Sequence, residues 1–276
     1  MSSRRKKISI AVFAAAFLLF FVAALLSEPT VHHESIKEVM RDAVLHETGR
    51  IGFFGDMTVN PALISAYVVT GIILVAALVI RIFVVPRFTL VPGKIQMLLE
   101  EAVNLFRGMA KTNSPDRNTF LGAYIFAAGT YIFIGTLFEL LGLQGVTTEG
   151  HSIALPAPLA DINGAIAMGF TSYAVILVEG IVGNGFRGAI QALKDFSLPI
   201  SMSFRLFGAL LSGALVTELV YYFYGLSFGV PVIVGVLFTL IHALIQAYVL
   251  TMLVSVFHGE ATEKHHAEHL PAEPHK

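Results

Sequence analysis

The stretch SFRLFGALLSGALVTE, residues 203–218, places one charged side chain, Arg205, inside a long apolar run. Arg205 is the only charged residue among the 22 that separate Asp195 from Glu218. A guanidinium costs about 2.5–3.5 kcal/mol at the centre of a membrane helix, and such a group usually faces a cavity or a partner. Both ends of the run lie on the order of 15–20 Å away, too far for the side chain to reach a membrane surface. The run therefore predicts a permanently charged group with a task inside a membrane.

The residues on the same helical face as Arg205 support this interpretation. They follow it at spacings of three, four, seven and eight, and all are small: Gly208, Ala209, Ser212 and Gly213. Small residues allow another helix to approach closely within a membrane. The sequence thus predicts a smooth face around the charge, against which a partner packs.

Other ionisable or amide side chains fall within apolar segments. These are Glu139, Glu179, Glu218, His242 and Gln246. Gln246 follows His242 by about one helical turn, so the two share roughly one face. Several such groups at different depths in a membrane are typical of a proton or ion pathway.

The composition explains which elements must position these residues. Hydrophobic residues make up 55% of the 276 and charged residues only 13%, against roughly 25% in soluble proteins. Charge-free runs recur at 8–27, 57–80, 118–138 and 162–178, and no Lys, Arg, Asp or Glu appears between Glu218 and Glu260. A bilayer requires about 20 apolar residues per helix. The fold class is therefore predicted to be an all-α polytopic membrane protein.

Six spans are expected, and the last two should be long and form a tilted hairpin. They are placed at about 8–27, 61–85, 119–141, 162–183, within 186–224, and 231–257. An interfacial helix should open the fifth segment, with a kink or restart at Pro199. Basic residues at 4–7 and in the loop 86–118 place both termini in the cytoplasm. The expected domains are an N-terminal helix and external segment (1–60), an ion-channel membrane domain (61–257) and a hydrophilic tail (258–276).

Several other interpretations are weaker. An uncleaved first helix is preferred to a signal peptide, because its apolar run is long and the cleavage site is poor. GNGFRG at 183–188 matches a dinucleotide pattern but follows a membrane helix instead of a strand. Ser212-Gly213 with His242 lacks the glycine that an intramembrane serine protease places two residues before its serine. The tail histidines His265, His266 and His269 have no scaffold to hold a metal.

Two whole-chain properties exclude further classes. A net charge of −1 offers no basic surface for nucleic acid, and the absence of cysteine removes disulfides and thiolate chemistry. No cofactor or metal is expected.

PISMSFRLFGA at 199–209 resembles the signature of subunit a in the membrane sector of F-type ATP synthases. ADIN at 160–163 and IQAYVLTML at 245–253 resemble two further segments of that family, in the expected order. The resemblance extends over roughly residues 88–263. It implies a stator subunit, in which Arg205 faces a rotating ring of c subunits and Gln246 is its neighbour on the last helix.

The same resemblance implies the rest of the functional assignment. Protons, or Na⁺ as the alternative ion, would pass through two half-channels to and from the c ring. They would enter past Glu218 and His242 and leave near Asp195, while other subunits make ATP. The implied partners are the c ring, the b-type peripheral stalk, the remaining synthase subunits and the surrounding lipid. The implied location is the inner membrane of a bacterium.

The sequence departs from the family pattern at four positions. Ala209 stands where the family usually has Asn, and Glu139 stands in helix three where Asn is common. Ala214 and Thr239 occupy two positions that are usually ionisable, with Glu218 and His242 each about one turn further along the chain. These changes predict an external half-channel with rearranged polar groups, in which Glu218 and His242 act in series.

A secondary transporter with Arg205 binding an anionic substrate is the alternative. Transporters commonly carry internal repeats and broken helices at mid-membrane. No repeat relates residues 1–140 to 141–276, which makes this alternative the weaker one.

Overall fold

The computed structural model describes residues 58–146, 152–222 and 230–263, together with scattered positions before residue 58. The expected first span, 8–27, lies outside the continuously described ranges. The tail beyond residue 263 also lies outside them.

Within the described residues, four helices are long and apolar enough to cross a membrane. They are Pro61–Arg87, Thr119–Leu141, Ile162–Asn184 and Gly235–Thr262. A fifth candidate is a bent pair, Phe186–Lys194 followed by Ser197–Gly213, with 46° between its two parts. All five coincide with spans expected from the sequence, so the prediction of a helical multi-pass membrane protein is confirmed for this part of the chain.

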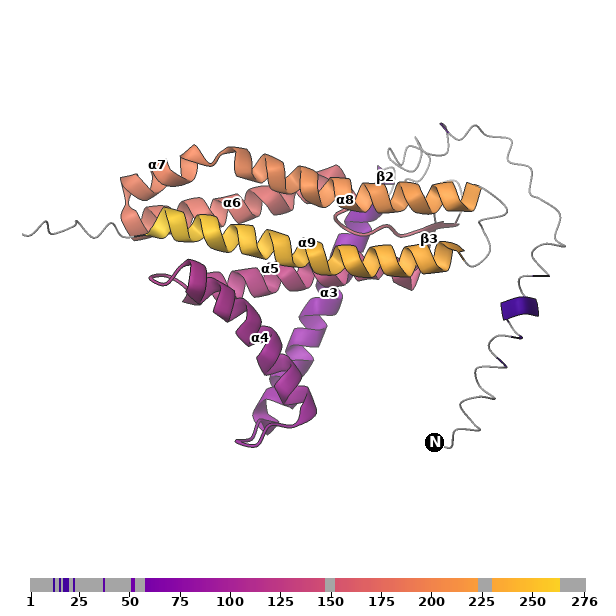
Figure 1. The fold of residues 1–276 in the computed structure, drawn as a ribbon, viewed down its shortest axis with the longest axis horizontal. Helices are drawn as coiled ribbons and strands as arrows, with labels where there is room; N and C mark the ends of the chain where they lie inside the picture. The colour runs from indigo at the N-terminus through magenta and orange to yellow at the C-terminus, as the bar shows by residue number, and fades with distance from the viewer. Residues whose placement is uncertain are drawn as a thin grey trace, which may run out of the picture.

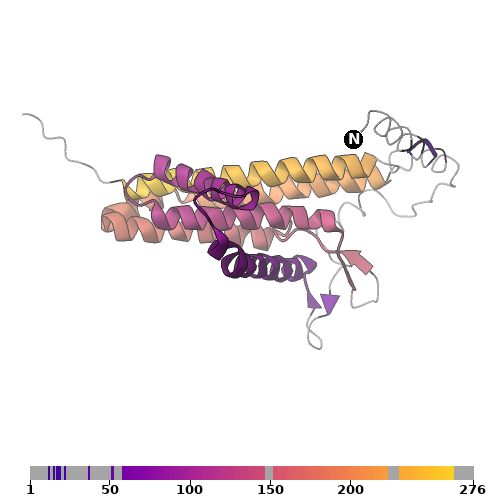
Figure 2. The same cartoon turned by 90° about the horizontal axis from the view of Figure 1, so that it is seen from below.

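Four of the long helices lie side by side along the length of the molecule. They are α5 (Thr119–Phe138), α6 (Ile162–Asn184), α8 (Ser197–Tyr222) and α9 (Val230–Thr262) (Figures 1 and 2). The contacting pairs are α5 with α9, α6 with α8, α6 with α9, and α8 with α9. Their shared core consists of fully buried apolar side chains, among them Leu121, Ile125, Ile132, Ile176, Met202, Leu206 and Val254.

Two further helices lean away from this bundle in Figure 1. Helix α3 (Pro61–Val79) continues through a π turn, Ile80–Val84, and a 3-10 turn, Val85–Arg87. Helix α4 (Lys94–Asn113) lies in the segment expected to be a loop. Its apolar residues Phe106, Met109 and Ala110 pack on the bundle core, and burial of this face stabilises the helix.

Two side-chain caps join α3 to α6. Asn60 accepts a hydrogen bond from the backbone N–H of Ala62, and Asp161 accepts one from Asn163. The Asn60 amide also donates to the Asp161 carboxylate at 3.0 Å. The starts of two spans that are distant in sequence are thereby tied together.

Short antiparallel hairpins precede these two helices. Strand β1 (Ile51–Gly52) pairs with β2 (Thr58–Val59), and β3 (Gln144–Val146) pairs with β4 (Ser152–Ala154). A 3-10 turn, Glu139–Leu141, joins α5 to β3. We call the end of the bundle near β3 and β4 the hairpin end.

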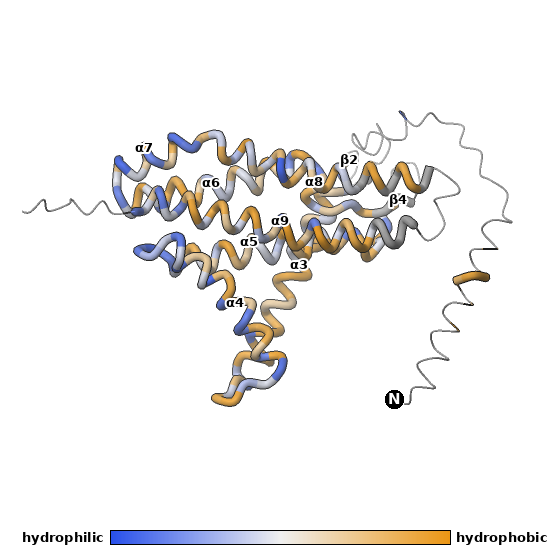
Figure 3. Tube along the Cα trace, in the orientation of Figure 1, coloured by the Kyte–Doolittle hydropathy of each residue, from blue (hydrophilic) through white to orange (hydrophobic). Residues whose placement is uncertain are grey.

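The opposite end, called the C-terminal end, contains α7 (Phe186–Lys194) and the close of α9. Hydrophilic residues gather there in Figure 3. The break before α8 falls at residues 195–196, earlier than the break expected at Pro199. Pro199 instead lies in the first turn of α8, where proline is tolerated because that N–H needs no helical partner.

The last helix also differs from the expectation. It was placed at 231–257 but runs to Thr262, so residues 258–262 belong to the bundle and not to a hydrophilic tail. The physical reason is that His258 and Thr262 are buried and find polar partners on other segments.

Helices α6 and α8 make a close backbone contact at Gly169. A Cβ at this position would lie 2.7 Å from the Pro199 carbonyl oxygen and 2.5 Å from Ser203 Oγ. Only a residue without a side chain fits, because the backbone of α8 would otherwise have to move.

We expect Gly169→Val to separate α6 from α8 and to destabilise the subunit by about 1–3 kcal/mol or more, as overpacking does. The measurement is thermal unfolding of the subunit in detergent. Gly71→Val is the matched control, since nothing lies within 4 Å of a Cβ on that exposed glycine of α3. Equal melting temperatures for the two variants would contradict the close contact.

Candidate functional site

Helix α8 has two different faces. Its buried side chains, which pack in the bundle core, are Leu198, Met202, Leu206 and Leu210. The exposed positions Ser201, Phe204, Arg205, Gly208 and Ser212 form a second stripe. The hydrophobic packing of the first face therefore holds the second face outward.

Arg205 lies in the middle of this exposed stripe. Among the described residues, its guanidinium makes no hydrogen bond and no ion pair. Five N–H donors thus point away from the bundle at a position where a membrane-spanning helix offers no water. The arrangement can stabilise a carboxylate on a partner that packs on this face.

The four small residues expected beside Arg205 divide between two surfaces. Gly208 and Ser212 are exposed with the arginine. Ala209 and Gly213 are half-buried and turn toward α9. Only two of the four therefore remain available on the open face.

The relative level of α8 and α9 follows from one close contact. A Cβ on Gly213 would lie 3.9 Å from Cδ1 of Phe238. Eight residues back from Gly213 on α8 is Arg205, and eight residues forward from Phe238 on α9 is Gln246. Because the helices are antiparallel and rise equally per residue, Arg205 and Gln246 lie at the same level.

Gln246 is buried, with 7% of its surface exposed. Its amide oxygen has no hydrogen-bond partner among the described residues. A buried acceptor without a donor costs about 1–3 kcal/mol, so this oxygen is able to take a donor from outside the described residues. The bundle thus holds an unpaired acceptor at the level of an unpaired cation.

A small cavity lies between α8 and α9, about one helical turn or more toward the hairpin end. Its volume is about 20 Å³, enough for roughly one water molecule. The lining residues come from three elements: Glu139, Ala209, Leu210, Gly213, Phe238, Thr239 and His242. The structure therefore brings Glu139 and His242 together, although 103 positions separate them in the sequence.

The histidine in this cavity has a defined orientation. His242 Nδ1 lies 2.9 Å from the carbonyl oxygen of Phe238, so it donates its N–H there. The imidazole also stacks on the Phe238 ring, with centroids 4.9 Å apart. Since Nδ1 is occupied, Nε2 is the nitrogen able to exchange a proton.

Glu218 and Asp195 lie apart from this cavity. Glu218 is nine residues beyond Ala209 on α8, about 13 Å along the axis from the level of His242. Its side chain is outside the described set. Asp195 is half-buried in the break between α7 and α8, on the other side of Arg205.

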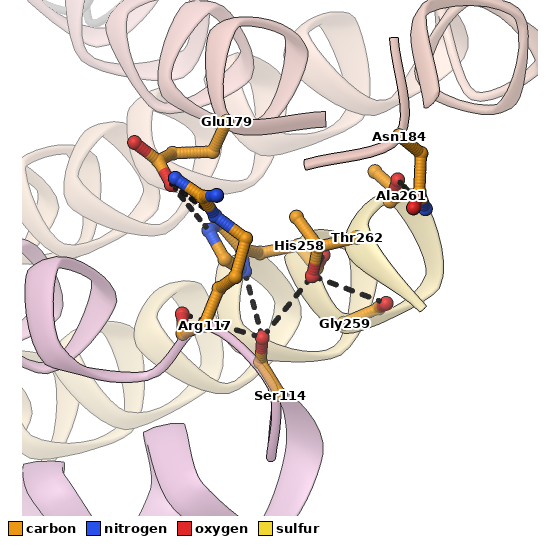
Figure 4. Close-up of polar contacts among 8 residues, drawn as sticks. All are labelled: Ser114, Arg117, Glu179, Asn184, His258, Gly259, Ala261 and Thr262. Atoms are coloured by element: carbon orange, nitrogen blue, oxygen red, sulfur yellow. Dashed lines mark hydrogen bonds and ion pairs between the residues drawn. The ribbon is translucent and has the colours of Figure 1, made fainter. Parts of the chain in front are cut away.

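One polar cluster was not anticipated as a unit. At the C-terminal end, Arg117 pairs with Glu179, and His258 lies beside them (Figure 4). The sequence alone indicates only one member of this cluster. Glu179 stood out as an acid in an apolar span, but His258 was assigned to the tail and Arg117 to a loop.

The fold and site define a class of protein, a multi-pass helical membrane protein that presents an arginine on an outward face. A family model described as ATP synthase A chain matches residues 66–259. The chain belongs to this family and is thus subunit a of the membrane sector of an F-type ATP synthase. Its partners are other subunits of that complex. The match gives no support to the alternative of a secondary transporter.

The level of α8 against α9 can be tested by cross-linking, because the chain has no cysteine of its own. We expect Gly213→Cys with Phe238→Cys to be joined efficiently by a short bifunctional thiol reagent. Gly213→Cys with Ile245→Cys is the control, about 10 Å further along α9 and on its exposed side. The measurement is the mobility shift of the intramolecular product after protease cleavage between α8 and α9. Comparable yields for the two pairs would contradict this register.

Proposed function

We propose that the chain is the stator half of the ion channel, and that it passes protons between two half-channels and a rotating ring of c subunits. The observation that carries the proposal is the unpaired guanidinium of Arg205 on an exposed stripe, level with the unpaired amide oxygen of Gln246. A partner carboxylate arriving at this face would pair with the guanidinium in its ionised form, and in its protonated form it could donate a hydrogen bond to the amide oxygen.

Arginine suits this position because it stays protonated at any relevant pH. It cannot carry the transported proton itself. It can favour the ionised form of a ring carboxylate and so make that carboxylate release its proton before passing. The same positive charge opposes direct movement of protons from one half-channel to the other.

The cavity holding Glu139 and His242 supports a route on the hairpin side, which we place toward the outside of the cell. One water between the carboxylate and His242 Nε2 would allow a proton to move toward the level of Arg205. Glu218, about 13 Å further along α8, would act before them in series. Asp195, beyond Arg205 near the C-terminal end, would serve the exit on the cytoplasmic side.

The small residues Gly208 and Ser212 fit close passage of ring helices. We infer further that b-type peripheral stalk subunits hold this subunit against the ring. The inferred location is the bacterial inner membrane. Both termini are inferred to be cytoplasmic, because basic residues at 4–7 and in the segment 86–118 of the sequence are expected on the inner side. The carried ion is a proton in this proposal, and Na⁺ is the alternative.

The central experiment uses the whole synthase in inverted membrane vesicles. ATP synthesis is driven by a proton gradient, with and without added Na⁺. Proton transport predicts a synthesis rate that is insensitive to Na⁺. A strict Na⁺ requirement would replace the proton in the proposal, and gradient-independent synthesis would overturn it.

Arg205→Ala should abolish gradient-driven ATP synthesis while the synthase still assembles, because the charge serves transport and makes no contact within the described chain. Arg205→Lys should fail or nearly fail, since an ammonium lacks the planar fork and loses its proton more readily when desolvated. Synthesis rates are measured in vesicles, with Arg187→Lys as a control on exposed helix α7. Wild-type synthesis rates in the Arg205→Lys variant would contradict the role proposed for Arg205.

Glu139→Gln, His242→Leu and Glu218→Gln should each slow synthesis, with the first two having the larger effect because they share one cavity. General acid–base groups in a relay contribute about 10²–10⁴-fold, so a loss of at least tenfold is expected at the cavity. Glu101→Gln on α4 is the matched carboxylate control, since Glu101 is exposed and lies outside the cavity. Unchanged rates in both cavity variants would show that protons take another route.

A further inference from the structure

The polar cluster at the C-terminal end joins three segments that meet around the last turns of α9: the connection between α4 and α5, helix α6, and α9 itself (Figure 4). Ser114 directly follows α4, and Arg117 precedes α5. Glu179 belongs to α6 and His258 to α9. We call these four residues the anchor cluster.

An ion pair forms the centre of the anchor cluster. Arg117 Nε and Nη2 each lie 3.0 Å from Oε2 of Glu179. The two side chains are 33% and 16% exposed, so water screens them only in part. His258 Nε2 is 4.0 Å from the same carboxylate oxygen, and the histidine is fully buried.

Hydroxyl groups extend the cluster along α9. His258 Nδ1 lies 3.0 Å from Ser114 Oγ, and Ser114 Oγ lies 3.2 Å from Thr262 Oγ1. Thr262 donates to the His258 carbonyl, and the Ser114 hydroxyl also lies 3.5 Å from the carbonyl oxygen of Arg117. The buried imidazole is thereby oriented, with Nε2 toward Glu179.

Further hydrogen bonds connect the same part of α9 to α4 and α6. The Asn113 amide donates to Ser255 Oγ, and Ser255 donates to the Met109 carbonyl at 3.0 Å. The Asn184 amide donates to the carbonyl oxygens of Ala261 and Glu263. Each of these bonds depends on the axial position of α9.

Close packing adds a steric stop. A Cβ on Gly259 would collide with the Asn113 carbonyl oxygen, so α9 touches the end of α4 directly. A shift of α9 by even one residue would bring Glu260 or His258 to this point. The C-terminal end of α9 can therefore hold only one register.

The part of α9 that carries Gln246 is held in a different way. One side of it is exposed and apolar, with Leu237, Ile241, Leu244, Ile245 and Tyr248 at 49–56% exposure. Apolar contacts on that side change little when a helix slides, because they have no direction. Packing on the buried side and the contact of Gly213 with Phe238 contribute to the axial position of Gln246, and directional polar contacts that add to them lie at the C-terminal end of α9.

We propose that the anchor cluster fixes the axial and rotational position of α9, so that Gln246 stays level with Arg205 while a partner moves past the exposed face. His258 follows Gln246 by twelve residues, so the anchor acts over about 18 Å of rigid helix. Arg117, Glu179 and His258 are positioning residues in this proposal. The part that concerns transport rests on the proposed function, whereas the part that concerns register does not.

The test measures register and transport in the same variants. Gly213→Cys is combined with Phe238→Cys in one background and with Gly235→Cys, one turn away, in another. Glu179→Gln is added to each, and the ratio of the two cross-linked products is compared with that of the unaltered anchor. We expect the ratio to fall by about tenfold, as for loss of a hydrogen bond between charged groups.

Rescue separates positioning from a general structural defect. Arg117→Glu combined with Glu179→Arg restores an ion pair, so the cross-link ratio and ATP synthesis should both recover most of the loss. Arg187→Ala, an exposed cation at the same end of the bundle, should leave both measurements unchanged. Where Glu179→Gln fails to accumulate in membranes, Ser114→Ala removes only the hydroxyl between His258 and Thr262 and gives the same comparison.

Each outcome has a distinct meaning. A shifted cross-link ratio with reduced synthesis, both restored by the charge swap, supports the anchor. Reduced synthesis with an unchanged ratio overturns it, because the cluster would then act on transport without moving α9. A shifted ratio with wild-type synthesis overturns the claim that register matters. Failure of the proposed function would appear separately, as normal synthesis in Arg205→Ala.

Discussion

The constraint on which the rest of the structure depends is an arginine that has a charge but no partner among the described residues of its own chain. A membrane-spanning helix offers Arg205 no water, and the described residues offer it no acid. The buried leucine and methionine side chains of α8 hold it on the outward face. In the proposed function, a carboxylate on another subunit pairs with this charge and offsets the cost of keeping it on an apolar face. The need for a partner is thus built into the isolated subunit.

The antiparallel pairing of α8 and α9 turns this single charge into a site. Gly213 allows close contact with Phe238, and the equal rise of the two helices then sets Gln246 opposite Arg205. The same pairing leaves a cavity of about 20 Å³ where Glu139 and His242 meet. Both features depend on one variable, the axial position of α9. Directional polar contacts are concentrated at the C-terminal end of that helix, away from the exposed face that carries Arg205.

The arrangement of α8 and α9 shows where the polar groups that depart from the family pattern lie relative to one another. The two positions that are usually ionisable carry Ala214 and Thr239, and Thr239 lines the cavity beside His242. Because the helices run in opposite directions, moving both groups forward in sequence separates Glu218 from His242 by about 13 Å. Glu139, at the position where the resemblance implies an asparagine, lines the same cavity as His242. The membership of the chain in the ATP synthase A chain family is therefore compatible with polar groups placed differently from the usual pattern.

The sequence by itself determined the helical membrane class, five of the span positions and the importance of Arg205, since length, hydropathy and a lone charge are local properties. It also indicated Gln246 and His242 as neighbours on one helix, because a helical period relates nearby residues. Only the tertiary structure decided that Glu139 meets His242, that Ala209 and Gly213 face α9 and not the open side, and that α4 is a helix. It alone joined Arg117, Glu179 and His258, which made residues 258–262 part of the bundle. These outcomes depend on contacts between segments far apart in the chain, and hydropathy cannot specify which faces of two apolar helices meet.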